Sequence, residues 1–589
     1  NNLYEYFYNS YKKSPDNIAI IYDNSKYSYR DCKYAAKQLS VELLHSKRIG
    51  IFLEKGIKQV ESVLAATMVG ATYIPIDIHN PEKRVHTIIK EAEIDVLITS
   101  RRLLNQMENQ FNTKCICVEE ISQKINYRDV DYVRENQIAY IIFTSGSTGI
   151  PKGVVISNRA ANNTILDINK RYSVGSNDRV LALSNIAFDL SVYDVFGMFE
   201  AGAAIVVPRE EDVKNPRKWV ELIHENFITI WNSVPTFMEM LCTYVEMNDV
   251  QIEKFATVRL ILLSGDKINK DLPSRIHLIM PQARIVCLGG ATEAAIWSNY
   301  YEPKEIDVDW PSIPYGYPLT NQKYYILNED LLLCPEYVEG ELYIAGAGLA
   351  DGYLNHKDLT ERKFLYNNEL GERIYKTGDR GKLIHGCIWF LGRQDTQIKK
   401  RGYRIELGEI ENVLQSIEYV KQAKVGYKDY KIYAFVCAKG TNSIDLEKLM
   451  ASLKKKMPDY YLPDTICVVS EMPLNENGKV DLKQLWANVQ KGENGRLEEE
   501  FLFTELEKSI GQIWKEVLKY KNKFLRNDDF FQCGGDSLRA VEVVSRINKN
   551  YPNVKLEMKD LFLNSTIKTL STEIEQRLVE SSLLDEGAI

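Results

Sequence analysis

The feature that most constrains the fold is an alternation of short apolar runs with amphipathic stretches from the start of the chain to about Gly392. Apolar runs such as Ile138–Phe143 and Leu260–Leu263 have the length and composition of buried strands. Helix-like stretches, for example Val60–Val69 and Arg217–Glu225, separate such runs. This order predicts a large α/β domain in which helices cover the sheets.

The pattern changes after Gly392, where a charged segment leads into an amphipathic helix. The residues on the apolar face of that helix are Ile410, Val413, Leu414 and Ile417. Alternating residues around Tyr433–Cys437 predict strands, and Leu446–Met457 predicts a further helix. We therefore expect a large N-terminal subdomain over residues 1–394 and a small α+β subdomain over residues 395–486.

A third unit follows a polar stretch, residues 487–503, whose glycines and asparagine predict a linker. Apolar residues then recur at helical spacing in Ile510–Leu518, Leu538–Ile547 and Ile567–Leu578. These stripes predict a small four-helix bundle over residues 504–580.

Charge and hydropathy exclude some partners. The formal net charge of −7 does not favour binding to nucleic acid. We find no uninterrupted apolar run of ~18 residues, so we expect no membrane span. The ten cysteines of the chain include no CxxC pair, and we expect reduced thiols in a cytoplasmic protein.

A glycine-, serine- and threonine-rich run, TSGSTGIPKG, begins at Thr144 directly after the strand-like run Tyr140–Phe143. Its glycines allow a backbone to approach a ligand closely, its hydroxyls and amides can donate to phosphate oxygens, and Lys152 adds a mobile positive charge. The spacing is not that of a Walker A loop. The candidate nucleotide-binding residues are Thr144, Ser145, Gly146, Ser147, Thr148, Gly149 and Lys152.

This run resembles the phosphate loop of the adenylate-forming superfamily, which includes acyl-CoA synthetases, luciferases and the adenylation domains of nonribosomal peptide synthetases. Further motifs similar to those of the superfamily follow in order: Phe188–Asp194 (FDLSVYD), Gly290–Glu293 (GATE), Tyr375–Asp379 (YKTGD), Gly392–Asp395 (GRQD), Lys400–Glu406 (KRGYRIE) and Asn477–Asp481 (NGKVD). The ordered set is far more specific than any single motif.

The resemblance implies a reaction with ATP and Mg²⁺ and a role for each matched residue. Thr292 is expected to contact the α-phosphate, Glu293 to hold Mg²⁺, and Asp379 to accept hydrogen bonds from the ribose hydroxyls. Arg393 is expected near the nucleotide. Lys479 is expected to bridge the substrate carboxylate and the nucleotide and to stabilise charge as it moves between them.

In the superfamily the small subdomain rotates about a hinge between two half-reactions. The resemblance places this hinge at Asp395. It implies that Lys479 faces the nucleotide in the first half-reaction and that the loop around Gly402 faces it in the second, lining the path of the acyl-accepting arm.

One position departs from the family pattern. Family members usually carry an aromatic residue, stacked on adenine, just before the Gly-Pro-Thr-Glu segment. Here Gly289 takes that position and Ala291 replaces the proline. The sequence does not indicate what holds adenine instead, although such glycine pairs occur in some cysteine-activating members.

Asp189 indicates an amino-acid substrate, because a buried carboxylate needs a cationic partner and a substrate ammonium supplies one. The other pocket positions can be assigned by alignment to the motifs. Together with Asp189 and Lys479 they resemble the pocket of cysteine-activating adenylation domains. These positions are Leu190, Tyr193, Asn232, Leu262, Ser264, Leu288, Ile296 and Trp297. The leucines and Ile296 would make a small apolar pocket with Asn232 and Ser264 as polar groups for a thiol. We expect L-cysteine as the substrate, with serine or a small aliphatic amino acid as the alternative.

The bundle contains DDFFQCGGDSL, which resembles the carrier-protein motif whose serine, here Ser537, takes a 4′-phosphopantetheine arm. This implies a peptidyl carrier domain over residues 504–580, modified by a phosphopantetheinyl transferase. It also implies a fragment of a synthetase for an antibiotic or siderophore, with neighbouring condensation or heterocyclisation domains. A CoA ligase with a fused helical tail and a non-catalytic nucleotide-binding scaffold remain alternatives.

Overall fold

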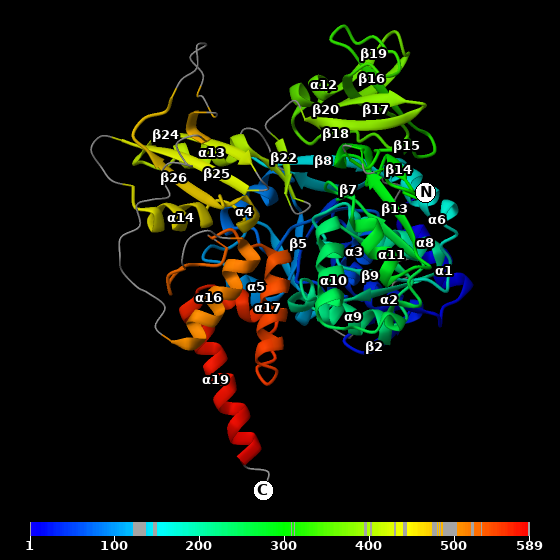
Figure 1. Cartoon of the computed structure of the whole chain (residues 1–589). Helices are drawn as coiled ribbons and strands as arrows, with labels where there is room; N and C mark the ends of the chain where they lie inside the picture. Colours follow the sequence, from blue (N-terminus) through cyan, green and yellow to red (C-terminus); the bar gives the residue numbers. More distant parts are fainter. Residues whose placement is uncertain are drawn as a thin grey trace.

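The computed structural model describes residues 2–121, 137–144, 150–307, 309–310, 312–393, 397–400, 403–428, 431–439, 444–473, 480, 482, 484–486, 504–519, 524–531 and 533–586. Several predicted residues lie outside the described residues: Lys479, Asp395, Gly402, Ser145, Gly146, Ser147, Thr148 and Gly149. The described chain forms a large N-terminal part, a small subdomain and a C-terminal helical domain beside them (Figure 1).

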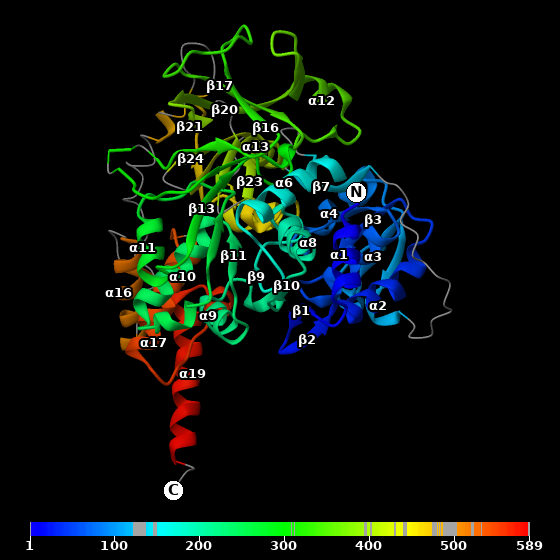
Figure 2. The ribbon, with the colours of Figure 1, turned by 90° about the vertical axis from the view of Figure 1, so that its right-hand side faces the viewer.

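Two large sheets form the core of the N-terminal part (Figure 2). The first has the strand order β15-β14-β13-β12-β11-β9-β10-β1-β2, and its strands from β13 to β1 are parallel. The bounds are β1 Ile18–Tyr22, β2 Ser25–Ser28, β9 Arg179–Ala182, β10 Ala204–Val207, β11 Ile230–Ser233, β12 Leu260–Leu263, β13 Arg284–Gly289, β14 Asn299–Tyr301 and β15 Tyr317–Pro318.

The second sheet has the order β18-β8-β7-β4-β3-β5-β6, in which β8 pairs antiparallel with both of its neighbours, β18 and β7. The bounds are β3 Arg48–Phe52, β4 Thr72–Pro75, β5 Val96–Thr99, β6 Lys114–Cys117, β7 Ile138–Thr144, β8 Lys152–Ser157 and β18 Gly352–Tyr353. The apolar runs predicted as buried strands are thus strands of these two sheets.

Helices cover the sheets, as the alternation predicts. Their bounds are α1 Tyr4–Lys13, α2 Tyr29–Ser40, α3 Ile57–Met68, α4 Glu82–Glu91, α5 Arg101–Asn105, α6 Asn158–Arg171, α7 Leu190–Val192, α8 Met198–Ala201, α9 Pro216–Glu225, α10 Pro235–Met247, α11 Leu272–Ile279 and α12 Lys357–Lys363. Buried residues of α3 and α6 share one apolar core with both sheets, whereas α9, α10 and α11 cover the other face of the first sheet. A π-helical turn, Tyr193–Gly197, joins α7 to α8, and such turns are frequent at functional sites.

The α/β expectation does not extend over all of residues 1–394. The segment before Arg393 forms an antiparallel five-stranded sheet, in which β16-β17-β20-β19 are neighbours and β21 pairs with β20. The bounds are β16 Gln322–Leu327, β17 Gly340–Gly346, β19 Phe364–Asn367, β20 Glu372–Ile384 and β21 Cys387–Arg393. The turn between β20 and β21 is too short for a crossover helix, so these strands pair antiparallel.

The described residues of the small subdomain include a hairpin, a three-stranded sheet and the helices α13 and α14. The bounds are β22 Gln397–Lys400, β23 Tyr403–Glu406, α13 Leu407–Gln415, β24 Val420–Lys428, β25 Lys431–Ala438, α14 Leu446–Lys454 and β26 Thr465–Val469. The helix predicted over Leu446–Met457 ends earlier, at Lys454. Pro458 follows Met457, and the residue before a proline disfavours helical backbone.

The C-terminal domain is the predicted helical bundle, made of α16 Glu505–Leu518, α17 Ser537–Asn550, α18 Met558–Leu563 and α19 Ile567–Glu586. Trp514 and Phe530 are fully buried in its core. The bundle lies beside α10 of the large part, and α19 runs outward to the C-terminus (Figures 1 and 2). In the part of the chain described, no helix combines the length and the apolar character needed to cross a membrane.

Candidate active site

A cavity of about 820 Å³ lies where the parallel strands of the first sheet end. Ligands bind at the carboxyl ends of parallel strands in open α/β sheets, and this cavity occupies that position. Residues just after β11, β12 and β13 line it, and so do residues of the hairpin β22–β23 and of the helical domain. The predicted site residues that line it are Thr144, Asp189, Leu190, Ser264, Thr292, Ile296, Trp297, Asp379, Arg393 and Ser537.

The other described site residues lie behind this lining. Tyr193, Leu262 and Leu288 belong to the apolar core under the cavity. Tyr193 packs its ring on Trp297, with centroids 5.1 Å apart, and the Trp297 indole donates to Ser264 Oγ at 2.9 Å. The structure therefore brings these predicted pocket positions together.

Asp189 is buried at the edge of the cavity, with 8% of its surface exposed. Burial raises its pKa to about 6, while a hydrogen bond from Thr292 and the charge of Lys399 act against the rise. A carboxylate of this kind gains from a cation placed beside it, because the cation offsets the cost of burying a charge.

Glu293 is fully buried and holds two partners. Its Oε1 accepts from the Tyr353 hydroxyl at 2.7 Å, and its Oε2 accepts from Arg404 Nη1 at 2.7 Å. Burial alone would raise the pKa of Glu293, but the charges of Arg404 and Lys152 and these hydrogen bonds lower it below its ordinary value. Burial, with the charge of Arg404, lowers the pKa of Lys152 to about 8.

Asp379 and Arg393 form an ion pair on adjacent strands at the cavity wall. Arg393 Nη1 donates to Asp379 Oδ1 at 2.7 Å, and the two residues are cross-strand partners of β20 and β21. Both side chains are mostly buried. The pair fixes the orientation of the Asp379 carboxylate at the cavity.

Asn232 ends a buried polar chain beneath Leu190. Its amide nitrogen donates to Asp194 Oδ1 at 2.8 Å and to the Leu190 carbonyl at 3.3 Å. Its Oδ1 has no hydrogen-bond partner among the described residues. Burial raises the pKa of Asp194 to about 7, and the charge of Lys55 acts against this rise.

Three residues of this site escape prediction from the sequence alone. Arg404 lies in the quoted motif KRGYRIE, but only the fold shows that it reaches Glu293. Asp194 is the last residue of FDLSVYD, and its burial could be suspected from that context. No motif marks Tyr353.

The small subdomain contacts the large part close to the cavity. Arg84 Nη1 of α4 lies 2.6 Å from Glu409 Oε1 of α13, and both side chains are buried. The ring of Phe188 meets that of Tyr403 edge to face, with centroids 5.0 Å apart. These contacts hold the hairpin β22–β23 over the cavity.

Ser537 is the first residue of α17, and Asp536 caps that helix by accepting from the backbone amide of Arg539. Ser537 is half-buried and lines the cavity. The N-terminus of a helix favours a phosphate group, so the position suits a phosphodiester on the Ser537 hydroxyl.

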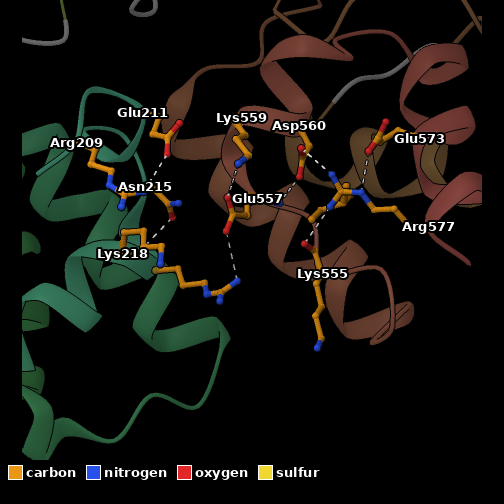
Figure 3. A network of polar contacts seen from close by, with 12 residues as sticks. Arg209, Glu211, Asn215, Lys218, Lys555, Glu557, Lys559, Asp560, Glu573 and Arg577 are labelled. Carbon is orange, nitrogen blue, oxygen red and sulfur yellow. Dashed lines mark hydrogen bonds and ion pairs between the residues drawn. The ribbon is translucent and has the colours of Figure 1, made fainter. Parts of the chain in front are cut away.

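The helical domain docks on the large part through polar and apolar contacts. Asn248 Nδ2, just after α10, donates to Ser545 Oγ of α17 at 3.0 Å. Arg217 Nη1 lies 3.5 Å from Glu557 Oε1 at the start of α18. Figure 3 shows this face, with Glu557 also beside Lys559. The docking brings the start of α17 to the cavity.

Comparison with known proteins matches three families. The family described as AMP-binding enzyme matches residues 7–354, the AMP-binding enzyme C-terminal domain matches residues 409–479, and the phosphopantetheine attachment site matches residues 508–574.

Individual proteins agree with these matches. The chain is 37% identical over 595 residues to the anguibactin system regulator of Vibrio anguillarum, which covers 97% of this chain and 55% of that protein. The chain thus spans about half the length of this relative. The structure of the nonribosomal peptide synthetase FmoA3 in its alpha-methyl-L-serine-AMP bound form is 32% identical in sequence, with a TM-score of 0.63. The match covers 82% of this chain and 49% of the FmoA3 chain.

The fold is also that of a didomain structure. PA1221, described as a holo protein containing adenylation and PCP domains bound to a vinylsulfonamide inhibitor, covers 98% of both chains with a TM-score of 0.81 and 22% identity. At that identity the likeness concerns the fold alone. The family match extends over more than half of the residues, and this chain belongs to the AMP-binding enzymes, with a phosphopantetheine attachment domain after its enzyme domains.

Proposed function

We propose that the chain activates an amino acid with ATP as an aminoacyl-AMP and loads it as a thioester onto a phosphopantetheine arm at Ser537. The observation that carries this proposal is that Ser537 lines the same cavity as Asp189, Thr292 and Asp379. An arm on Ser537 therefore enters the cavity in which the adenylate would lie. Its thiol would take the aminoacyl group as AMP leaves.

The position of the small subdomain supports the proposal that this arrangement of the domains is the one used for the loading half-reaction. Arg404 occupies one oxygen of Glu293 and Tyr353 the other. Glu293 would hold Mg²⁺ once Arg404 withdraws, so the pair suits the stage after pyrophosphate has left. The roles predicted for Lys479 and for a hinge at Asp395, and the domain bounds given above, remain predictions.

L-cysteine is the amino acid we propose. Asp189 offers a charge for the substrate ammonium, and Leu190, Ile296 and Trp297 wall the cavity beside it. Asn232 lies behind Leu190 with both amide hydrogens committed, and its Oδ1 would accept from a thiol or hydroxyl that reaches this depth below the lining. The alpha-methyl-L-serine-AMP bound by FmoA3 has a small side chain with such a donor.

We also propose the wider setting: a cytoplasmic synthetase for a siderophore or antibiotic, with condensation or heterocyclisation domains as neighbours and a phosphopantetheinyl transferase as partner. The likeness to FmoA3, described as a nonribosomal peptide synthetase, supports the synthetase setting.

Two assays on the same protein test the function. The first is amino-acid-dependent ATP–pyrophosphate exchange across the twenty amino acids, and the second is covalent loading of the holo-protein with labelled amino acid. Ser537→Ala should keep exchange and lose loading, whereas Ser509→Ala, a serine of α16, should keep both. Loading of the Ser537→Ala protein would contradict the proposal, and release of free aminoacyl-CoA with Ser537 unmodified would favour a CoA ligase.

The substrate is tested by kcat/KM for cysteine, serine, alanine and valine. An apolar wall separates near-isosteres by about 10²-fold, so serine should be a weak substrate. Valine should be excluded by overlap with Tyr193 and Trp297. If serine or valine were used better than cysteine, the substrate assignment would be wrong while the loading assay could still hold.

A further inference from the structure

Gly289 has no side chain, and the ring of Tyr315 fills the space where one would lie. A Cβ built on Gly289 would come within 2.9 Å of Tyr315 Cζ, and closer still to Cε2. Real Cβ atoms essentially never approach so closely, so a larger residue at position 289 would have to displace the ring. The space that an aromatic side chain at position 289 would occupy is thus filled by the ring of Tyr315, which comes from a different segment of the chain.

The Tyr315 ring is held firmly by its surroundings. Its backbone amide donates to the Ile388 carbonyl at 2.9 Å, and its carbonyl accepts from the Asn299 side chain. The ring meets Tyr324 edge to face at 6.1 Å and lies 5.7 Å from the ring of Phe390. Tyr315 is half-buried, so part of its side chain remains accessible.

The ring also lies next to the groups that mark the nucleotide end of the cavity. Gly289 and Gly290 line the cavity together with Asp379 and Arg393, and the Tyr315 ring lies directly behind Gly289, which has no side chain to cover it. Burial, and then the charge of Asp379, raise the pKa of Tyr315, and a hydrogen bond from the Gly290 backbone to its hydroxyl opposes them. Tyr315 is therefore close to both the glycine pair and the acidic residue of the cavity wall.

We propose that Tyr315 provides the aromatic surface on which the adenine of ATP stacks, in place of a side chain at position 289. Adenine is flat and aromatic, and an aromatic side chain offers it an apolar face at low entropic cost. Removal of one stacking side chain typically weakens binding by about 5- to 150-fold. The inference concerns only the nucleotide and does not depend on which amino acid is activated.

The test measures dissociation constants of AMP and of ribose 5-phosphate by calorimetry on the full-length protein. Tyr315→Ala should weaken AMP by about 5- to 150-fold and leave ribose 5-phosphate unchanged, because the second ligand lacks the base. Tyr315→Phe should bind AMP like the wild type. Tyr317→Ala, an exposed neighbour on the same segment, is the matched control and should change neither constant.

A second pair of variants keeps the proposal falsifiable if Tyr315→Ala unfolds. Gly289→Phe should lose AMP affinity because its ring collides with Tyr315, and adding Tyr315→Ala to Gly289→Phe should restore it. The proposal is overturned if Tyr315→Ala binds AMP normally, if it weakens both ligands equally, or if Gly289→Phe alone binds AMP as the wild type does.

Discussion

The buried ion pair between Arg84 and Glu409 gives the sharpest prediction about the two half-reactions. It joins α4 of the large part to α13 of the small subdomain, with 2.6 Å between the charged atoms and side-chain exposures of 9% and 2%. Burial raises the pKa of Glu409, and the Arg84 guanidinium offsets part of that rise. Replacing Arg84 by methionine keeps the apolar contacts and removes the charge.

The size of the effect follows from the carboxylate of Glu409, which the Arg84→Met variant leaves buried without a counter-charge. Removing one partner of a buried pair costs about 3–5 kcal/mol. If the pair forms only in the orientation used for loading, the variant disfavours that orientation by a factor of roughly 2 × 10² to 5 × 10³. Loading of the arm on Ser537 should slow by up to this factor, while pyrophosphate exchange should stay the same or rise.

The assay compares single-turnover loading with pyrophosphate exchange in the same preparation. Lys90→Met, an exposed position on α4, is the matched control. The double variant Arg84→Met with Glu409→Met should load faster than Arg84→Met alone, because two apolar side chains remove the buried unpaired charge. Equal loss of both half-reactions in Arg84→Met, or unchanged loading, would refute the reasoning.

Three further variants probe the site. Burial raises the pKa of Asp189 to about 6, and only the ionised carboxylate pairs with an ammonium. We therefore expect kcat/KM for the amino acid to fall as the pH drops through 6. In the Asp189→Asn variant this fall of kcat/KM at low pH should be absent. Lys479→Ala should stop adenylate formation yet still load the carrier from supplied aminoacyl-AMP; near-normal adenylate formation would contradict its role. Asp395→Pro should impair one half-reaction far more than the other, since proline fixes φ at a hinge. Full retention of both half-reactions would place the hinge elsewhere, and equal loss of both would indicate misfolding.

The sequence could predict the parts of the fold that are local. Runs such as Leu260–Leu263 have strand length and composition, and the helix over Ser537–Asn550 shows its period directly. It could not predict the antiparallel sheet before Arg393, because short apolar runs do not say whether strands pair parallel or antiparallel. Nor did it mark α18, which at six residues is too short to show a helical period.

In the site, too, the residues within motifs could be predicted from the sequence, whereas their partners could not. Motif order was enough to name Asp189, Glu293 and Asp379, which the fold brings to one cavity or directly behind it. The partners of these residues depend on tertiary structure. Arg84 and Glu409 are 325 positions apart, and the ring that fills the space at Gly289 comes from a separate segment. Such pairings follow from packing and leave no spacing in the sequence.

Glu293 suggests how one cavity can serve two reactions. A fully buried carboxylate is costly without a counter-charge, so Glu293 needs a cation in every state of the enzyme. If it holds Mg²⁺ during adenylation, as predicted, that cation must be replaced when the metal leaves. Arg404, on the hairpin β22–β23 that also lines the cavity Ser537 reaches, would supply the replacement beside the charge of Lys152. The exchange of counter-charge at Glu293 would therefore favour the loading arrangement only after the first half-reaction is complete.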